Sequence, residues 1–307
     1  MKAWVRLPAL PEAAGAYRWF YADVSAGPYS AVCIFMLGSL FSPRYSVAAR
    51  RGGLPLEHSA VNFALYHDGV RRLWVLSEYA RAELEAPGRL RIGRSTLAYA
   101  EDGTVRMDVD DWTAPWGRPV RAGLTLTPMT PVGEVVQLMP GLPHYWQALA
   151  PRARARLEVS SLGIEAEGLG YHDTNHGEEL LGARLSGWHW ARTHREDETV
   201  VDYHLPEGVA PLRVVAGACG VRCERGSAPQ PRPTSITGWG LRVPSRLHAG
   251  NIVVGAPKLL ESSPFYARLE ARTGPLDSMG EVADFRRFHS PFIRWMAHFR
   301  TRVGPAA

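Results

Sequence analysis

Ionisable and aromatic side chains are concentrated in the stretch from Gly168 to His194. Its first half is rich in Gly, Asn, Asp and Thr, which disfavour a helix, so we interpret it as an extended strand. Because the side chains of a strand alternate, Tyr171, Asp173 and Asn175 would share one face. Ionisable groups beside large aromatic surfaces are what a site needs in order to protonate an apolar substrate. The same residues also fit a polar turn between two strands above a tryptophan core.

The composition excludes several other kinds of site. The chain has 307 residues, of which 46% are hydrophobic and 21% charged, as in ordinary globular proteins. Its three cysteines, an odd number, argue against a disulfide framework and for a reducing compartment. The net charge is +5, but the arginines are spread along the chain, so we expect no nucleic-acid partner. The sequence shows no phosphate loop, zinc-ligand pair or redox motif, so we expect neither a cofactor nor a metal.

Many short segments are punctuated by glycine and proline, a pattern typical of a mainly β protein. Residues 120–127 alternate between apolar and polar side chains, as a half-buried strand does. Residues 29–40 are almost continuously apolar, which indicates a strand buried on both faces. A connection interrupted by Pro and Gly, at 128–143, suggests a domain boundary. We therefore expect two barrel-like or sandwich-like β domains, at residues 1–140 and 141–307.

The end of the chain carries a different pattern. From Glu281 to Val303, apolar residues recur at helical spacing with arginines between them, and Pro291 indicates a break or a new helix start near Ser290. This fits a closing helical segment packed on the β domains. It also fits a basic amphipathic segment that rests on an anionic membrane surface. We expect a cytoplasmic protein, which in the second case is peripheral on the inner face of the membrane.

Several stretches, spread over most of the chain, form a recognisable series. They are WFYAD (19–23), GSLFSPRY (38–45), HSAVNFALY (58–66), HYWQALAP (144–151), GYHDTNHGEE (170–179), SPFYAR (263–268) and the terminal residues 291–302. Each alone is a weak signal, but in this order and together they resemble the carotenoid 1,2-hydratase family, the hydroxyneurosporene synthases. The family pattern also leads us to expect a histidine and a tryptophan near the positions that Thr174 and His176 occupy here.

The resemblance implies a fold of two lipocalin-like β units, shared with a broader group that includes cofactor-free Diels–Alderases. It implies a hydro-lyase that adds water to the terminal C1=C2 bond of acyclic carotenoids such as neurosporene and lycopene. The partner would be a hydrophobic isoprenoid substrate, which resides in membranes.

Hydration of such an alkene defines the groups that the site must supply. A trisubstituted alkene is a weak base, so a positioned acid must protonate C2, after which water captures the tertiary cation at C1. Asp173 and Asp202 are the candidate acids, because both lie on expected strands among aromatic residues. We favour Asp202 as the donor and Asp173 as the group that orients the water or His176. Each aspartate also fits a structural role, bonded to a turn or an arginine.

The remaining candidates would hold the water or surround the substrate. His176 would bind the attacking water, and aromatic rings would stabilise the cation through their quadrupoles. The predicted catalytic residues are Asp202, Asp173, His176 and Tyr203. The predicted substrate-binding residues are Trp188, Trp190, Tyr171, Asn175, Trp19, Tyr21 and Asp23.

Two other functions stay open on the same fold. A cofactor-free cyclase for a polyene or terpenoid would need a shaped pocket but no water site. A lipocalin-like carrier would bind a lipid and do no chemistry. A carrier would tolerate the loss of every aspartate named above, whereas a hydratase would lose its activity with its proton donor.

Overall fold

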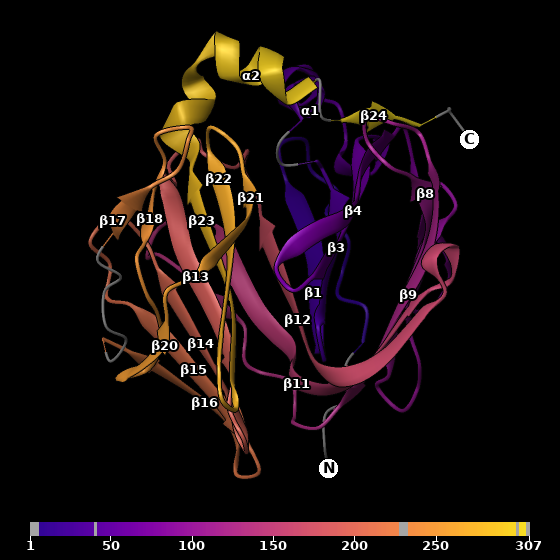
Figure 1. The fold of residues 1–307 in the computed structure, drawn as a ribbon. Helices are drawn as coiled ribbons and strands as arrows, with labels where there is room; N and C mark the ends of the chain where they lie inside the picture. Colours follow the sequence, from indigo (N-terminus) through magenta and orange to yellow (C-terminus); the bar gives the residue numbers. More distant parts are fainter. Residues whose placement is uncertain (1–5, 40–41, 227–232, 299–300, 305–307) are drawn as a thin grey trace. The chain divides into compact units, whose positions relative to one another are not determined.

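The computed structural model describes residues 6–39, 42–226, 233–298 and 301–304. Within these ranges the chain is mainly β, which confirms the predicted fold class (Figure 1). It divides into two units, which we describe separately: unit 1 holds residues 1–181 and 294–307, and unit 2 holds residues 182–293. The predicted boundary near residue 140 therefore falls inside unit 1. The physical reason is that strand 144–159 pairs with strands on both sides of that boundary.

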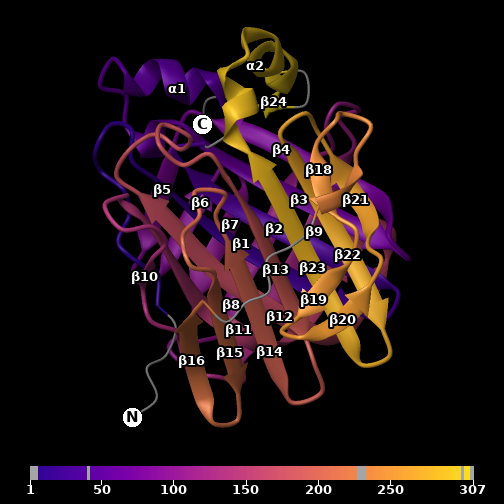
Figure 2. The ribbon, with the colours of Figure 1, turned by 90° about the vertical axis from the view of Figure 1, so that its left-hand side faces the viewer.

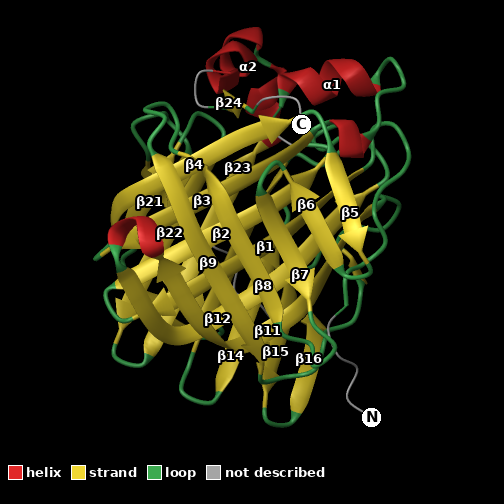
Figure 3. Cartoon of the chain, turned by 90° about the vertical axis from the view of Figure 1, so that its right-hand side faces the viewer, coloured by secondary structure: helices red, strands yellow, loops and turns green. Residues whose placement is uncertain are grey.

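Unit 1 is built on one large, curled sheet (Figure 3). In spatial order its described strands are β24 (Arg302–Val303), β4 (Val70–Tyr79), β3 (Ser59–His67), β2 (Tyr29–Leu37), β1 (Tyr17–Ala26), β12 (Ile164–Gly177), β11 (His144–Val159), β9 (Pro119–Pro128), β8 (Val105–Trp112), β7 (Ser95–Tyr99), β6 (Arg89–Ile92) and β5 (Ala82–Ala86), with β10 (Val136–Gln137) paired to β11. Neighbouring strands are antiparallel, except that β24 runs parallel to β4.

The first hairpin of unit 1 illustrates how the sequence pattern forms the sheet. Gly27 and Pro28 join β1 to β2, and Gly27 has a φ of 58°, a conformation that glycine adopts without strain. β2 is buried along most of its length, in agreement with its apolar sequence. On β1, Phe20, Ala22 and Val24 enter the hydrophobic core of unit 1. The intervening residues of β1 therefore lie on the opposite face of the sheet.

A long hairpin of β11 and β12 crosses unit 1. The two strands are joined by the short 3-10 helix η2 (Ser160–Leu162) and by Gly163. Along β11 the register with β12 shifts between Ala148 and Ala150 and again between Ala150 and Ala153. Such bulges each insert an extra residue into one strand. They determine that His144, at the far end of β11, pairs with Gly177.

Unit 2 contains a second antiparallel sheet and two short ribbons (Figure 2). In spatial order the described strands of this sheet are β16 (Gly220–Arg225), β15 (Leu212–Gly217), β14 (Glu198–His204), β13 (Gly187–His194), β23 (Leu276–Asp284), β22 (Tyr266–Thr273) and β21 (Lys258–Ser262). The ribbons are β17 (Pro233–Ile236) with β18 (Arg242–Pro244), and β19 (Leu247–Ala249) with β20 (Ile252–Gly255). Apolar residues of the ribbons, such as Val243 and Leu247, pack with Leu269 and Val282 of the sheet.

The described helices are few and short. They are α1 (Pro43–Ala49), η1 (Pro55–Glu57), η3 (Phe285–His289) and α2 (Pro291–His298), besides η2. α1 begins at a proline, and the hydroxyl of Ser42 accepts hydrogen bonds from two backbone N–H groups of its first turn. Among the residues described, no helix has the length and apolar character needed to cross a bilayer.

The predicted terminal helical segment is confirmed in part. α2 begins at Pro291, directly after Ser290, so the predicted break is present. The apolar residues at 281–284, however, belong to β23, because this strand continues its ladder with β13 as far as Asp284. The helical spacing is therefore real only from Phe285 onward. Phe299 and Arg300, which continue the pattern in the sequence, lie outside the described residues.

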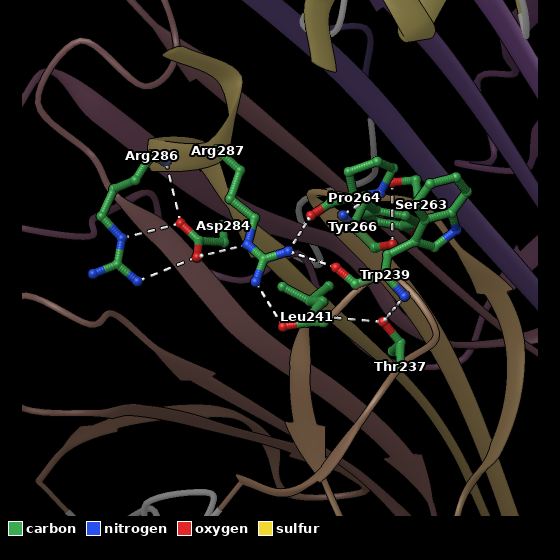
Figure 4. A network of polar contacts seen from close by, with 10 residues as sticks. Thr237, Trp239, Leu241, Ser263, Pro264, Tyr266, Asp284, Arg286 and Arg287 are labelled. Carbon is green, nitrogen blue, oxygen red and sulfur yellow. Dashed lines mark hydrogen bonds and ion pairs between the residues drawn. The ribbon is translucent and has the colours of Figure 1, made fainter. Parts of the chain in front are cut away.

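A single arginine anchors the segment that precedes α2 (Figure 4). The guanidinium group of Arg287 donates hydrogen bonds to the carbonyl groups of Trp239, Gly240 and Pro264, at 2.6 to 3.0 Å. Its Nε lies 3.6 Å from the carboxylate of Asp284. Arg287 thereby ties η3 to the turn between β17 and β18 and to the loop before β22.

Candidate functional site

One face of β1, β12 and β11 in unit 1 gathers polar and aromatic side chains. The register of β1 with β12 places Tyr21 opposite Asp173, so both residues point to the same face. By the same alternation this face, which we call the polar face, carries Tyr17, Trp19, Tyr21, Asp23, His144, Trp146, Tyr171, Asp173 and Asn175. All of these side chains are buried. The polar face is opposite to the face on which Phe20 and Ala22 enter the core.

Asp173 receives two hydrogen bonds on the polar face. The indole N–H of Trp146 donates to its Oδ2 at 2.9 Å, and the hydroxyl of Tyr171 donates to the same oxygen at 2.6 Å. The ring of Tyr21 packs edge-on against Tyr171, with 6.1 Å between the ring centroids. A carboxylic acid accepts through its carbonyl oxygen and carries its proton on the other oxygen. A neutral Asp173 side chain with these contacts would therefore carry its proton on Oδ1.

His144 lies on the polar face as well, opposite Gly177 in the β11–β12 register. Its Nδ1 forms a hydrogen bond with the hydroxyl of Tyr17. Burial lowers the pKa of His144 to about 3, so the imidazole is neutral near pH 7. Within the described part of the chain, its Nε2 is buried without a hydrogen-bond partner. This nitrogen is therefore open to a ligand or a water molecule.

His176 lies on the other face of β12 from Asp173, because their positions differ by three, an odd number, along a strand. Its ring stacks on Tyr145, with 5.0 Å between the centroids. Burial, and to a lesser extent the charge of Arg18, lower the pKa of His176 to about 4. The alternation of β12 thus does not favour the predicted contact between Asp173 and His176.

Asp202 is held in an ion pair in unit 2. Arg213, its cross-strand neighbour on β15, binds both carboxylate oxygens at 2.7 and 3.3 Å. Burial raises the pKa of Asp202, and the hydrogen bonds and charge of Arg213 oppose that shift. A bidentate arginine favours the ionised carboxylate. The geometry therefore favours the structural alternative for Asp202 over the role of proton donor.

The aromatic candidates of unit 2 point away from Asp202. Ala191 is the residue opposite Asp202 in the β13–β14 register, so Trp188 and Trp190 lie on the other face of this sheet, as does Tyr203. Trp188 and Tyr203 are in ring contact there, with 6.4 Å between the centroids. All three rings are buried. They form an aromatic face of unit 2, from which Asp202 is absent.

A small cavity in unit 2 adjoins Asp202. It measures about 40 Å³ and is lined in part by His189, His204 and His248. That volume admits water but not an isoprenoid chain. Burial lowers the pKa of both His189 and His204 to about 4. Among the described residues, no group of three or more His, Cys, Asp or Glu side chains is placed to bind a metal ion.

His144 and Trp146 had no predicted role. Both lie in the stretch 144–151, which contributed to the family resemblance. A histidine and a tryptophan were expected near Thr174 and His176, and the structure supplies these residue types from the adjacent strand β11. The sequence did hold one signal for them: His144 and Trp146 are two positions apart, which places both side chains on one face of a strand.

The fold and the polar face define a mainly β, lipocalin-like protein with a buried carboxyl group among aromatic rings. The family model described as carotenoid hydratase CrtC matches residues 33–304. The chain therefore belongs to the carotenoid hydratase family, a family of hydro-lyases, and the resemblance seen in the sequence is confirmed.

Individual relatives agree with this assignment. The chain is 34% identical over 303 residues to the acyclic carotenoid 1,2-hydratase of Thiocapsa roseopersicina, which covers 94% of this chain and 74% of the relative. It is 31% identical to the enzyme of the same name from Rubrivivax gelatinosus, over 89% of this chain and 68% of the relative. Among solved structures, an AttH protein from Nitrosomonas europaea superimposes with a TM-score of 0.60 at 13% identity, covering 90% of this chain and 93% of that one. At this identity the likeness concerns the fold alone.

Proposed function

We propose that this chain adds water to the terminal C1=C2 double bond of an acyclic carotenoid. The observation that carries the proposal is the pair of hydrogen bonds from Trp146 and Tyr171 to the buried Asp173. They orient a carboxyl group within an aromatic, water-poor face, and a positioned acid is what protonation of an alkene requires. Membership of the carotenoid hydratase family supports the same reaction.

Asp173 is the proton donor in this proposal. Its Oδ1 proton passes to C2, which forms the new C–H bond and leaves the positive charge on the tertiary carbon C1. The carboxylate that results keeps two hydrogen bonds at Oδ2, which strengthen as negative charge develops there. The contacts that orient the acid therefore also lower the barrier to its ionisation.

Aromatic rings of the polar face stabilise the cation. The rings of Tyr21, Tyr171 and Trp146 surround the carboxyl group, so a substrate carbon that reaches Asp173 also lies near their π surfaces. An aromatic face attracts a cation through its quadrupole, and the attraction is larger when the site excludes water. Trp19 extends this surface toward His144.

His144 takes the part of the water-binding residue that the sequence had suggested for His176. Its Nε2 is buried on the same face as Asp173, and among the described residues it has no partner. A water held there attacks C1 through oxygen, and one of its protons returns to the carboxylate of Asp173. The acid is thereby restored, and the reaction needs no oxidant or reductant.

Pigment analysis tests the function directly. The protein is produced in cells that make lycopene or neurosporene, beside the Asp173→Asn variant. We expect products heavier than the substrate by one water per hydrated end, and none with the variant. A new pigment of unchanged mass would favour a cyclase, and unaltered substrate despite binding would favour a carrier.

We further propose that α2 brings the protein to the membrane in which its substrate resides. Phe292 and Trp295 are 63% and 56% exposed and lie one turn apart on α2. Exposed aromatic residues on a short amphipathic helix insert at the level of the lipid headgroups. The net charge of +5 adds attraction to anionic lipid.

A further inference from the structure

We propose that Tyr17 is a positioning residue for the step in which water captures the cation. Its side chain passes over strand β12 at Gly177, and its hydroxyl fixes the ring of His144. The inference rests on the proposed hydration and adds a residue that acts through another, without touching the substrate. Tyr17 was not among the residues that the sequence singled out.

Gly177 makes the crossing possible. In the strand ladders this glycine pairs with Tyr17 on one side and with His144 on the other. A Cβ atom built on Gly177 would lie 2.5 Å from Cζ of Tyr17 and 2.6 Å from its hydroxyl oxygen. The tyrosine ring thus occupies the space of the missing side chain and reaches a residue two strands away. Gly177 is needed here for close packing.

The hydrogen bond from Tyr17 selects one tautomer of His144. A phenol is a stronger donor than a neutral imidazole, so the Tyr17 hydroxyl donates and Nδ1 of His144 accepts. A neutral imidazole carries a single N–H, which is then on Nε2. Among the described residues this N–H has no acceptor. His144 therefore presents a donor to the polar face.

Aromatic contacts restrict both rings. Tyr17 stacks on Trp19 with 5.5 Å between the centroids and an angle of 12° between the planes. Trp19 also contacts His144, at a centroid distance of 6.0 Å. Tyr17 and His144 are each only 2% exposed. The direction of the His144 N–H is thus set by a tyrosine that is itself fixed by a tryptophan.

A donor at Nε2 gives His144 a defined task. The N–H holds a water through one lone pair of its oxygen, and the second lone pair forms the C–O bond to C1. One proton of the added water goes to the carboxylate of Asp173, which gave its own proton to C2. Without the orienting hydroxyl, the cation would more often lose a proton to that carboxylate before water captures it.

The test uses Tyr17→Phe, which keeps the ring and removes the hydroxyl. It compares how often the cation is captured by water with how often the cation loses a proton and returns to the alkene. Reactions run in D2O, and mass spectrometry follows deuterium in recovered substrate and in hydrated product. We expect hydration to fall about tenfold, the effect of one hydrogen bond, while the ratio of exchanged substrate to product rises. Hydration at the normal rate, or hydration and exchange reduced in equal proportion, would overturn the proposal. A wild-type protein that neither hydrates nor exchanges would instead refute the proposed function.

A second variant and an independent readout cover a folding defect in Tyr17→Phe. Gly177→Ala should displace Tyr17 and raise the same ratio. Gly170→Ala is the matched control, because its Cβ would press on Leu126 and Ala155, away from Tyr17. In ¹⁵N NMR spectra of histidine-labelled protein, His144 should be the Nε2–H tautomer in the wild type and a mixture in Tyr17→Phe. The Nδ1–H tautomer in the wild type would overturn the proposal whatever the activities.

Discussion

Trp146 and Asp173 are joined by a hydrogen bond between neighbouring strands, in which the indole N–H on β11 lies 2.9 Å from Oδ2 on β12. Tyr171 donates to the same oxygen from within β12. The carboxyl group is therefore oriented by two donors that come from different backbone positions. Each donor can be removed separately by a substitution to Phe, which leaves an aromatic ring in its place.

Asp173→Asn should abolish most of the hydration, because the amide keeps the volume but carries no acidic proton. General acid catalysis contributes about 10²–10⁴-fold, and the loss should reach at least that range. The measurement is product formation from lycopene per folded protein. A folded Asp173→Asn variant with near-normal turnover would exclude the residue as the proton donor.

Asp202→Asn should instead lower the stability. It leaves the guanidinium of Arg213, whose side chain is 11% exposed, without its charged partner, and breaking a largely buried pair in this way costs about 3 kcal/mol. Urea unfolding should show the loss, while the folded fraction keeps its turnover. A variant with full stability but no activity would instead indicate that Asp202 is the proton donor.

Trp146→Phe and Tyr171→Phe should each reduce kcat/KM by about 10–100-fold, since each removes a hydrogen bond that strengthens as Asp173 ionises. Tyr171→Phe keeps its ring, and Trp146→Phe puts a smaller aromatic ring in the place of the indole. Trp112→Phe on β8 is a suitable control, because its ring contacts Arg94 and Arg302 instead. Equal losses in all three variants would indicate a general packing defect.

The free energy of unfolding should fall as the pH is lowered from about 6.5 to about 4. Burial lowers the pKa of His144 to about 3 and that of His172 to about 4, below the value of about 6.5 in an unfolded chain. In this window the unfolded state binds more protons, so each residue reduces the free energy of unfolding by about 1.4 kcal/mol per pH unit. Urea titrations at a series of pH values measure the slope, and His172→Gln should decrease it. A free energy of unfolding that is unchanged from pH 7 to pH 5 would contradict the buried, neutral state.

Membrane binding should depend on the exposed rings of α2. The double variant Phe292→Ser with Trp295→Ser should lose most of its flotation with anionic liposomes, because the inserted apolar surface is removed. Added salt should weaken the binding of the wild type. Trp116→Ser is the control, since this tryptophan is 80% exposed in a turn between β8 and β9. Binding that is absent, or insensitive to salt and to α2, would argue against the proposal.

The sequence predicted the alternation of β12 and the candidacy of Asp173, because a period of two is a local property of a strand. It did not predict that Trp146 reaches Asp173. A regular hairpin extended from the pair Val159–Ile164 would be two residues out of register at His144, since two bulges intervene in β11. Bulges depend on the packing of the whole sheet, so local pattern does not reveal them.

The sequence also did not identify Arg213 as the partner of Asp202. Arg213 faces Asp202 only because β14 and β15 pair in one particular register. From the sequence, an aspartate between Val201 and Tyr203 looks like an acid in apolar surroundings. The tertiary structure turns it into half of an ion pair, and the preference between the two aspartates is reversed.

The parallel pairing of β24 with β4 has a consequence for how the chain is assembled. β24 belongs to unit 1, yet all of unit 2 precedes it in the sequence. Unit 2 is thus an insertion within unit 1, and the edge of β4 at Ser77 and Glu78 stays uncovered during synthesis until Arg302 and Val303 emerge. Uncovered edge strands invite pairing with other chains. A truncated chain that ends after α2 should therefore expose Ser77 and Glu78 at this edge to pairing with a second chain, even with every residue of the polar face in place.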